Sequence, residues 1–168
     1  WGKPLGHQKQ DMDANPMNAV FLDGLDWMAE ALELELDERS VETEYAVATR
    51  DIDLPWMRFP KGTVAGQRIT WRGFAHGRAV LALTVAWKMG EDLEPNWSAP
   101  QGYEIVIEGE PRIRTVVELE QPTLPALSRE PDRMDLIMIC TAMPPVLAIP
   151  YVCEAEPGIK TYFDLPFT

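Results

Sequence analysis

Residues 62–73 read GTVAGQRITWRG, and residues 77–87 read GRAVLALTVAW. Both stretches are long, and both alternate. The link between them is short and is flanked by Gly73 and Gly77. Two alternating segments around a short glycine-containing link are typical of a β-hairpin. We therefore expect two adjacent antiparallel strands at this point of the chain.

The second strand of this hairpin is apolar on both faces. Its alternation puts Leu81, Leu83, Val85 and Trp87 on one face and Val80, Ala82, Thr84 and Ala86 on the other. A strand that is apolar on both sides is usually covered on both sides. We therefore expect this strand in the centre of a sheet.

A helix is predicted before the hairpin. Asn15 and Pro16 form a helix start, since Asn caps the first turn and proline needs no hydrogen-bond donor there. The helix should run to about Leu34. Its apolar stripe comprises Val20, Phe21, Leu25, Met28 and Leu32.

The rest of the chain adds strands and then a second helix. From Val41 to Thr49 the period changes to two, which predicts a strand, and residues 51–60 look irregular. Residues 103–109 and 112–120 form a second hairpin around a Gly-Glu-Pro turn. A hydrophobic helix then begins near Arg133, and prolines should interrupt and restart it. This order predicts an α+β fold, an open, mostly antiparallel sheet of about five strands with helices on one face.

Composition narrows the classes of function. The 168 residues suit one domain with a sizeable core, and we expect residues 1–168 to form a single domain. The net charge of −12 disfavours nucleic acid and anionic membranes as partners, because both require a basic surface. We expect no membrane segment, since prolines interrupt the longest apolar run, Leu136 to Val152.

The two cysteines bear on the cellular location of the protein, and the first residue bears on whether the chain is part of a longer protein. Cys140 and Cys153 lie in apolar surroundings and fit neither a metal-ligand spacing nor a disulfide framework, so we expect buried free thiols and a cytoplasmic location. Two histidines without paired spacing predict no metal site. The chain begins with Trp1, so we expect it to be part of a longer protein.

The hairpin resembles the C-terminal domain of dihydrodipicolinate reductase-like enzymes. Those proteins carry a Gly-x-x-x-Gly-x-His strand, a glycine turn and a second alternating strand. Here the matching run is residues 62–68, with Arg68 in the place of the histidine. The reductase also has a paired histidine motif before its first helix. Residues 6–16 repeat its residue types in part but not its spacing, so the reductase's catalytic roles are not transferred.

The C-terminal part of the chain is similar to a divergent branch, the 2,4-diaminopentanoate dehydrogenase and related NAD(P)H-dependent amine dehydrogenases. The similarity spans nearly the whole chain and lies in short motifs that occur in the same order. The motifs are Asn15-Pro16-Met17, Trp87-Lys88-Met89-Gly90, Thr141-Ala142-Met143, Ala148-Ile149-Pro150, Val152-Cys153, Glu156 to Thr161 and Asp164-Leu165-Pro166.

This resemblance implies a two-domain parent that transfers hydride to or from a C–N bond of an amine or imine. An N-terminal Rossmann domain would bind NAD(P), and this chain would supply the substrate pocket and the interface of a homo-oligomer. The chain itself has no Gly-x-Gly-x-x-Gly fingerprint and no strand-turn-helix cradle for a dinucleotide. We therefore expect no cofactor to bind to this chain alone, and the isolated chain to be inactive.

With that chemistry in view, the loop before the first helix holds two catalytic candidates, His7 and Lys9. They would provide a proton donor and a cation near the imine, next to the positive end of a helix. The alternative is an ordinary exposed loop. Asn15 is a substrate-binding candidate in the same place, and its alternative role is to cap the helix.

Four further substrate-binding candidates lie in the strands and in the second helix. Arg68 either binds a substrate carboxylate through its guanidinium fork or pairs with one of the many acids. Trp87 would line an aromatic pocket with Trp71, Trp97 and Tyr103, or else belong to the core. Thr141 and Met143 precede the prolines, where freed backbone carbonyls would face a ligand or the missing domain, or else they simply pack.

Two hypotheses remain for the whole chain. The first is the substrate-binding and assembly domain of the oxidoreductase just described. It predicts an apolar open sheet face that pairs across subunits, and exposed apolar surface around Leu136 to Val152 and the aromatic tail. The second is a stand-alone module that binds a small ligand in a cup of helix and curved sheet, without catalysis.

Overall fold

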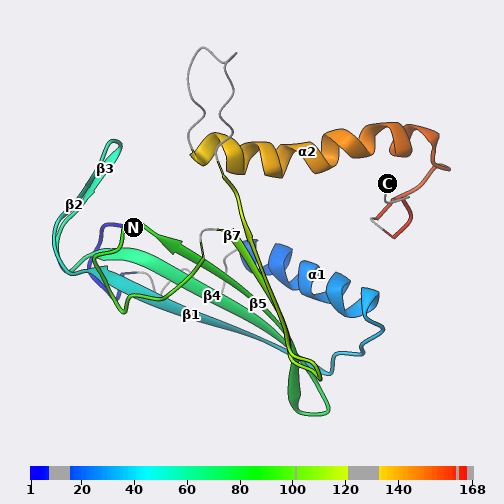
Figure 1. Ribbon diagram of the computed structural model, residues 1–168, viewed down its shortest axis with the longest axis horizontal. Helices are drawn as coiled ribbons and strands as arrows, with labels where there is room; N and C mark the ends of the chain where they lie inside the picture. Colours follow the sequence, from blue (N-terminus) through cyan, green and yellow to red (C-terminus); the bar gives the residue numbers. More distant parts are fainter. Residues whose placement is uncertain (8–15, 101, 121–132, 162, 166–168) are drawn as a thin grey trace. The chain divides into compact units, whose positions relative to one another are not determined.

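The computed structural model describes residues 1–7, 16–100, 102–120, 133–161 and 163–165, and its chain is drawn in Figure 1. It divides into two compact units, Trp1–Ala99 and Pro100–Thr168. The first unit contains helix α1 and a four-stranded sheet. The second contains a two-stranded hairpin and helix α2.

Helix α1 spans Pro16–Ala31 and confirms the predicted start at Pro16. It ends three residues earlier than predicted, because Glu33 takes a left-handed backbone conformation with φ of 55°. The amide of Leu34 then donates to the carbonyl of Ala29 at 2.9 Å, which closes the helix in a Schellman-type turn. A left-handed residue at this position is usually glycine, so Glu33 is under backbone strain.

The main sheet has the strand order β5-β4-β1-β6, and all its pairs are antiparallel. Its strands are β1 (Glu38–Ala48), β4 (Val64–Ala75), β5 (Arg78–Lys88) and the short β6 (Leu93–Glu94). The predicted hairpin is confirmed as β4 and β5. Its turn is the pair His76 and Gly77, both with positive φ, as a tight two-residue hairpin turn requires.

The expectation that the second strand of the hairpin is central is wrong. β5 lies at the edge of the sheet, and β4 lies between β5 and β1. β4 carries most of the buried positions, whereas β5 exposes side chains such as Val80. The sequence of β5 is apolar on both faces because alanine and valine occupy many of its exposed positions. These side chains do not require a second neighbouring strand.

Helix α1 packs on one face of the sheet, against β4 and β5 (Figure 1). The ring of Phe21 stacks on Trp71 at 4.3 Å between centroids, and the Trp71 indole N–H donates to Asn18 Oδ1 at 3.2 Å. Leu25 is fully buried, and Gly73 of β4 leaves room for the side chains of Leu25 and Leu36. Because the indole nitrogen has a partner, Trp71 is buried without leaving a polar atom unpaired.

The apolar stripe predicted for α1 is correct at Phe21 and Leu25 and wrong at its other three positions. Ala29 completes the buried row, while Val20, Met28 and Leu32 are exposed. Residues 21, 25 and 29 follow one line of the helix, and residues 20 and 28 lie about a quarter turn away from it. The outer side of α1 is therefore partly apolar.

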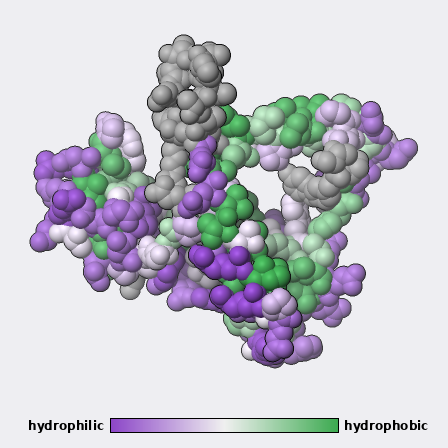
Figure 2. All heavy atoms as spheres, in the orientation of Figure 1, coloured by the Kyte–Doolittle hydropathy of each residue, from purple (hydrophilic) through white to green (hydrophobic). Residues whose placement is uncertain are grey.

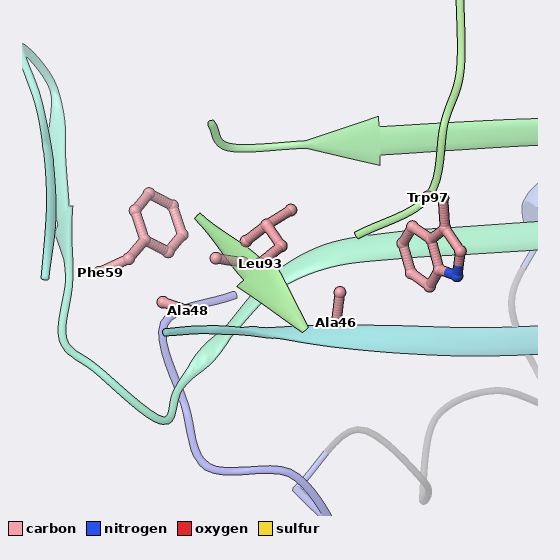
Figure 3. Packing of buried hydrophobic residues seen from close by; sticks show 6 residues of the cluster. Ala46, Ala48, Phe59, Leu93 and Trp97 are labelled. Carbon is pink, nitrogen blue, oxygen red and sulfur yellow. The ribbon is translucent and has the colours of Figure 1, made fainter. Parts of the chain in front are cut away.

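A second cluster fills the end of the sheet where β6 joins β1, and Figure 3 shows its side chains. Residues 51–60, which looked irregular, contain two short paired strands, β2 (Ile52–Leu54) and β3 (Met57–Phe59). Phe59 from β3 enters the cluster fully buried, beside Leu93 from β6. Its buried members are Ala46, Ala48, Phe59, Ala65, Leu93 and Trp97.

The second unit contains the other predicted hairpin and the hydrophobic helix. Strands β7 (Gly102–Ile107) and β8 (Ile113–Glu118) pair in register from Gly102 opposite Glu118 to Ile107 opposite Ile113. Helix α2 spans Arg133–Glu154 and continues through all three of its prolines. The predicted interruption is therefore wrong. A proline removes one backbone hydrogen bond, and the remaining turns of this helix persist around the gaps.

Helix α2 exposes its apolar side chains, which Figure 2 shows along the helix. Leu147, for example, is 62% exposed. Cys140 and Cys153 are exposed as well, so the expectation of buried thiols is wrong. By length and composition alone, the segment Ile137–Glu154 could cross a membrane, with a mean hydropathy of 1.5. The reason given against a membrane segment, that prolines interrupt this apolar run, is therefore wrong, since the prolines do not end the helix.

The fold class is confirmed as α+β. An antiparallel sheet with a helix on one face forms the first unit, and the main sheet has four strands rather than about five. The exposed apolar surface predicted around Leu136 to Val152 is present on the described part of α2.

Candidate functional site

The face of the sheet opposite α1 forms a shallow, open depression of about 360 Å³. Residues opposite each other in an antiparallel pair share a face, and here they come from the three long strands β1, β4 and β5. The side chains are polar or charged throughout. We call them the charged face, and they are Glu42, Glu44, Arg68, Thr70, Arg72 and Thr84.

Two ion pairs cross from β4 to β1 on the charged face. Arg68 lies directly opposite Glu44, and its Nε donates to Glu44 Oε2 at 2.6 Å. Arg72 reaches diagonally to Glu42, with Nη1 donating to Oε2 at 2.7 Å. All four side chains are about one third or more exposed, so each pair contributes at most about 1 kcal/mol to stability.

Arg68 is held on a second side by an aromatic ring. Its guanidinium carbon lies 5.0 Å from the ring centroid of Trp97, within the range of a cation–π interaction. Trp97 is only 7% exposed and packs over Gly66, the neighbour of Arg68 on the same face of β4. Beside it, the hydroxyl groups of Thr70 and Thr84 form a hydrogen bond of 3.0 Å across β4 and β5.

The charged face therefore has its charges already paired. Both carboxylates accept from guanidinium groups, and the two hydroxyls bond to each other. The open face of the main sheet is therefore charged rather than apolar. An apolar open face of the kind expected is present on the β7–β8 sheet, where Tyr103, Ile105, Ile107, Ile113 and Val117 share one side and are exposed.

The catalytic candidates lie before the first helix. His7 is exposed in a turn, and its backbone N–H donates to the carbonyl of Pro4 at 3.4 Å. Pro4 pairs with Thr63 just before β4, so this turn is anchored to the start of that strand. Lys9 and Asn15 lie outside the described residues.

The aromatic candidates do not form one pocket. Trp87 lies opposite Gln67, on the face of the sheet that α1 covers, and Trp71 shares that face. Trp97 lies on the opposite face beside Arg68. Tyr103 belongs to the second unit and is exposed. The sheet therefore separates side chains that the strand pattern alone grouped together.

Thr141 and Met143 lie on α2, and both side chains are exposed. The hydroxyl of Thr141 donates to the carbonyl of Ile137 at 2.9 Å, one turn earlier in the helix. Pro144 and Pro145 follow within the same helix. The two candidates therefore lie beside the prolines of α2, in a helix that continues through them.

The sequence interpretation found Arg68 but missed its neighbours on the charged face. The alternation was visible, since Glu42 and Glu44 share one face of a strand, as do Arg68 and Arg72. What was missing was the register that sets Glu44 opposite Arg68. A search for opposite charges at two-residue spacing in neighbouring strands would have suggested it.

The described residues do not fit a dinucleotide or a metal ion. None of the described strands leads through a glycine-rich turn into a helix, and residues 119–132, which connect β8 to α2, contain no glycine. Within the same described ranges, no three His, Cys, Asp or Glu side chains cluster as metal ligands would.

Comparison with known proteins agrees with the resemblance found in the sequence. Residues 18–168 match the family model of the 2,4-diaminopentanoate dehydrogenase C-terminal domain. The chain belongs to this family. It is therefore an oxidoreductase-type domain, and the match covers both structural units described above.

A relative of known name supports the same class. The chain is 25% identical over 172 residues to a protein named amine dehydrogenase from Streptomyces virginiae. The alignment covers 98% of this chain but 46% of that protein. The chain thus spans less than half the length of this relative.

Proposed function

We propose that the chain is the substrate-binding and assembly domain of an NAD(P)-dependent oxidoreductase that acts on the C–N bond of an amine or imine. The observation that carries this proposal is the family match over residues 18–168. The name of the relative from Streptomyces virginiae supports the amine chemistry.

The division of labour follows from what the described residues lack. They offer no cradle for a dinucleotide, while the relative is more than twice as long as the aligned segment. In the proposed enzyme, NAD(P) binds to a Rossmann domain outside this chain and accepts or donates the hydride. The residues of this chain bind and orient the amine.

The charge of the chain supports a cationic substrate. A net charge of −12 produces a negative potential over the surface, and such a potential raises the local concentration of cations. Alkylamines are cations at neutral pH, whereas nucleic acids and other polyanions are repelled. This attraction increases the rate at which any protonated amine meets the protein, and it does not distinguish one amine from another.

The exposed side chains of α2 support the assembly role. Apolar groups such as Ile139, Leu147 and Ile149 are more than half exposed. An apolar helix surface of this kind marks a contact with another protein surface. In the proposed enzyme it is covered by the nucleotide-binding domain or by a second copy of the chain in a homo-oligomer.

The test is an assay of the complete gene product. The purified protein is mixed with NAD⁺ or NADP⁺ and a panel of monoamines and diamines, and with the reduced cofactors and cyclic imines. We expect a change of nicotinamide absorbance with at least one of these substrates. Proven cofactor binding without turnover of any substrate would contradict the proposal.

A matched control separates the two domains. The same gene product without residues 1–168 should still bind the cofactor and should not turn over the amine. Light scattering on the complete protein tests the assembly role. A strictly monomeric active enzyme would contradict that part of the proposal and leave the catalytic part standing.

A further inference from the structure

The hairpin of β7 and β8 is a sheet of two strands, and no other described strand pairs with either of them. One side of the hairpin is apolar and exposed, as described above, with Ile105 and Ile107 each 55% exposed. A two-stranded sheet is marginally stable in water unless further strands or a helix are added to it. The hairpin (β7 in Figure 1) therefore needs a neighbour.

The charges along β8 reverse their sign about its central residue. Residues 112–120 read RIRTVVELE, with Val116 in the middle. Arg112 and Arg114 precede Val116, and Glu120 and Glu118 follow it at the same two distances. Arg114, Val116 and Glu118 lie on the side of the strand opposite the apolar one, because every second residue of a strand shares a side. One half of this edge is therefore basic and the other half is acidic.

Such a strand is complementary to a second copy of itself. When two copies of β8 pair antiparallel about a two-fold axis at Val116, Arg114 of each copy lies opposite Glu118 of the other. Arg112 lies opposite Glu120 in the same way, and the symmetry forms each pair twice. Opposite charges directly across two strands stabilise the pairing, whereas like charges destabilise it.

The ion pairs within the hairpin are compatible with this arrangement. The two arginines bond to Glu104 and Glu108 of the same hairpin through their Nε atoms. A guanidinium group has two further nitrogens that donate. Glu118 and Glu120 are exposed, and among the described residues no basic side chain forms an ion pair with either of them. The acidic half of the edge therefore gains partners in the pairing of two copies.

The other outer strands of the described sheets lack this pattern. β5 carries Arg78 and Lys88 and no acid. β7 and the turn after it carry Glu104, Glu108 and Glu110 and no base. Either strand would match one half of β8 and leave the other half without an opposite charge. β6, the remaining outer strand of the main sheet, has only two residues.

We propose that β8 is the pairing edge of a homodimer, in which two hairpins form one antiparallel sheet of four strands in the order β7-β8-β8-β7. The contact uses the same edge on both copies, so it closes at two copies. It also covers an edge that would otherwise be open to aggregation. A two-fold axis perpendicular to the sheet puts both apolar sides on one side of the dimer. This inference rests on the proposed function and deepens it, because it names the partner and the contact of the assembly role.

A cysteine on the two-fold axis tests the contact directly. In this pairing Val116 lies opposite its own copy, with Cα atoms about 4.5–5.5 Å apart, a separation that a disulfide spans. Val116→Cys is made in the complete gene product together with Cys140→Ser and Cys153→Ser, because both natural thiols are exposed. We expect oxidation with copper phenanthroline to convert most of the protein to a dimer on a denaturing gel.

The matched control is Val106→Cys in the same background. Val106 is opposite Arg114 on the same side of the hairpin, and it is 40% exposed against 38% for Val116, but it belongs to β7. This variant and the background without a new cysteine should form little cross-linked dimer. No cross-link through position 116, or equal cross-linking through positions 106 and 116, would overturn the proposal.

Charge reversal tests the register of the pairing. Arg114→Glu and Glu118→Arg should each raise the dissociation constant of the dimer about tenfold in analytical ultracentrifugation, because the symmetry puts like charges together at two sites. An equal mixture of the two variants should form a heterodimer as stable as the unmodified dimer, since each new acid then faces a new base. Glu104→Gln is the control, because it removes the bond between Arg114 and β7 and leaves the charges of the β8 edge unchanged. Failure of the mixture to recover, or an equal effect of Glu104→Gln, would overturn the proposal.

Enzyme assays separate this inference from the proposed function. Turnover of an amine by a protein that does not cross-link through Val116→Cys would overturn the β8 pairing and leave the enzyme assignment intact. Cross-linking through this cysteine in a protein that binds the cofactor and turns over no substrate would support the pairing and contradict the enzyme assignment. A dimer that both charge reversals leave unchanged would assign the contact to another surface, such as α2, and would overturn the pairing.

Discussion

Replacement of Gly66 by alanine tests the packing beneath Arg68. A methyl group built at this position would lie 2.9 Å from Ala46 Cβ, 3.1 Å from Leu93 Cδ1 and 3.3 Å from Trp97 Cζ3. Ala46 is fully buried, and it is directly opposite Gly66 in the β1–β4 pair. Its Cβ is fixed to the backbone, so the strands must separate or Trp97 must move.

The cost follows from two opposing effects. Overpacking a well-filled core costs about 1–3 kcal/mol. Replacing glycine in a strand regains about 0.5–1 kcal/mol, because the unfolded chain becomes less free. We therefore expect Gly66→Ala to lower the free energy of unfolding by about 1–2 kcal/mol. Displacement of Trp97 should also remove the aromatic partner of Arg68.

The assay is unfolding in urea, followed by tryptophan fluorescence. With a slope of about 2 kcal/mol/M, the midpoint should fall by about 0.5–1 M. The control is the exchange Ala46→Gly with Gly66→Ala, which moves the methyl group across the strand pair. The double variant should be more stable than the sum of the single changes predicts. A Gly66→Ala protein as stable as the unmodified chain would refute the packing.

Three further changes test single features of the first unit. Glu33→Gly should stabilise the chain by about 1 kcal/mol in thermal unfolding, because glycine removes the left-handed strain, whereas Glu33→Ala should not. An equal gain from alanine would contradict this reason. A double-mutant cycle with Arg68→Ala and Glu44→Ala should give a coupling of about 0.5–1 kcal/mol, screened by salt, and a value of zero would mean that the pair is not formed in solution. A backbone hydrogen bond from Lys61 and a side-chain bond from Arg58 lower the pKa of Asp51 below its usual value of 3.8. Its contribution to stability is therefore complete above that pH and is lost as the pH falls through the lowered pKa. NMR titration should show this lowered pKa, and Asp51→Asn should remove the part of the acid dependence of stability that Asp51 contributes. An unshifted titration would refute the assignment.

The sequence predicted most of the elements, because their patterns are local. Pro16 starts α1, and the turn at Gly77 joins two long strands. The errors concern neighbours in space. β5 was expected in the centre of the sheet because it is apolar on both faces, yet it forms an edge.

The charged face shows why only part of the candidate site could be predicted from the sequence. Arg68 stood out among small residues, but its partner Glu44 lies 24 residues away in the sequence and is selected by the register between β1 and β4. A shift by one residue would have turned Glu44 toward α1. The cysteines of α2 illustrate the opposite error, since apolar neighbours in sequence did not make them buried.

The amino-acid sequence alone therefore determined most of the element types, the family resemblance and the acidic charge. Each of these depends on covalent structure or on residues a few positions apart. The tertiary structure alone decided the edge position of β5, the separation of Trp71 from Trp97 and the pairing of Arg68 with Glu44. These depend on strand order and register, which are set by the sum of many distant contacts rather than by any local pattern.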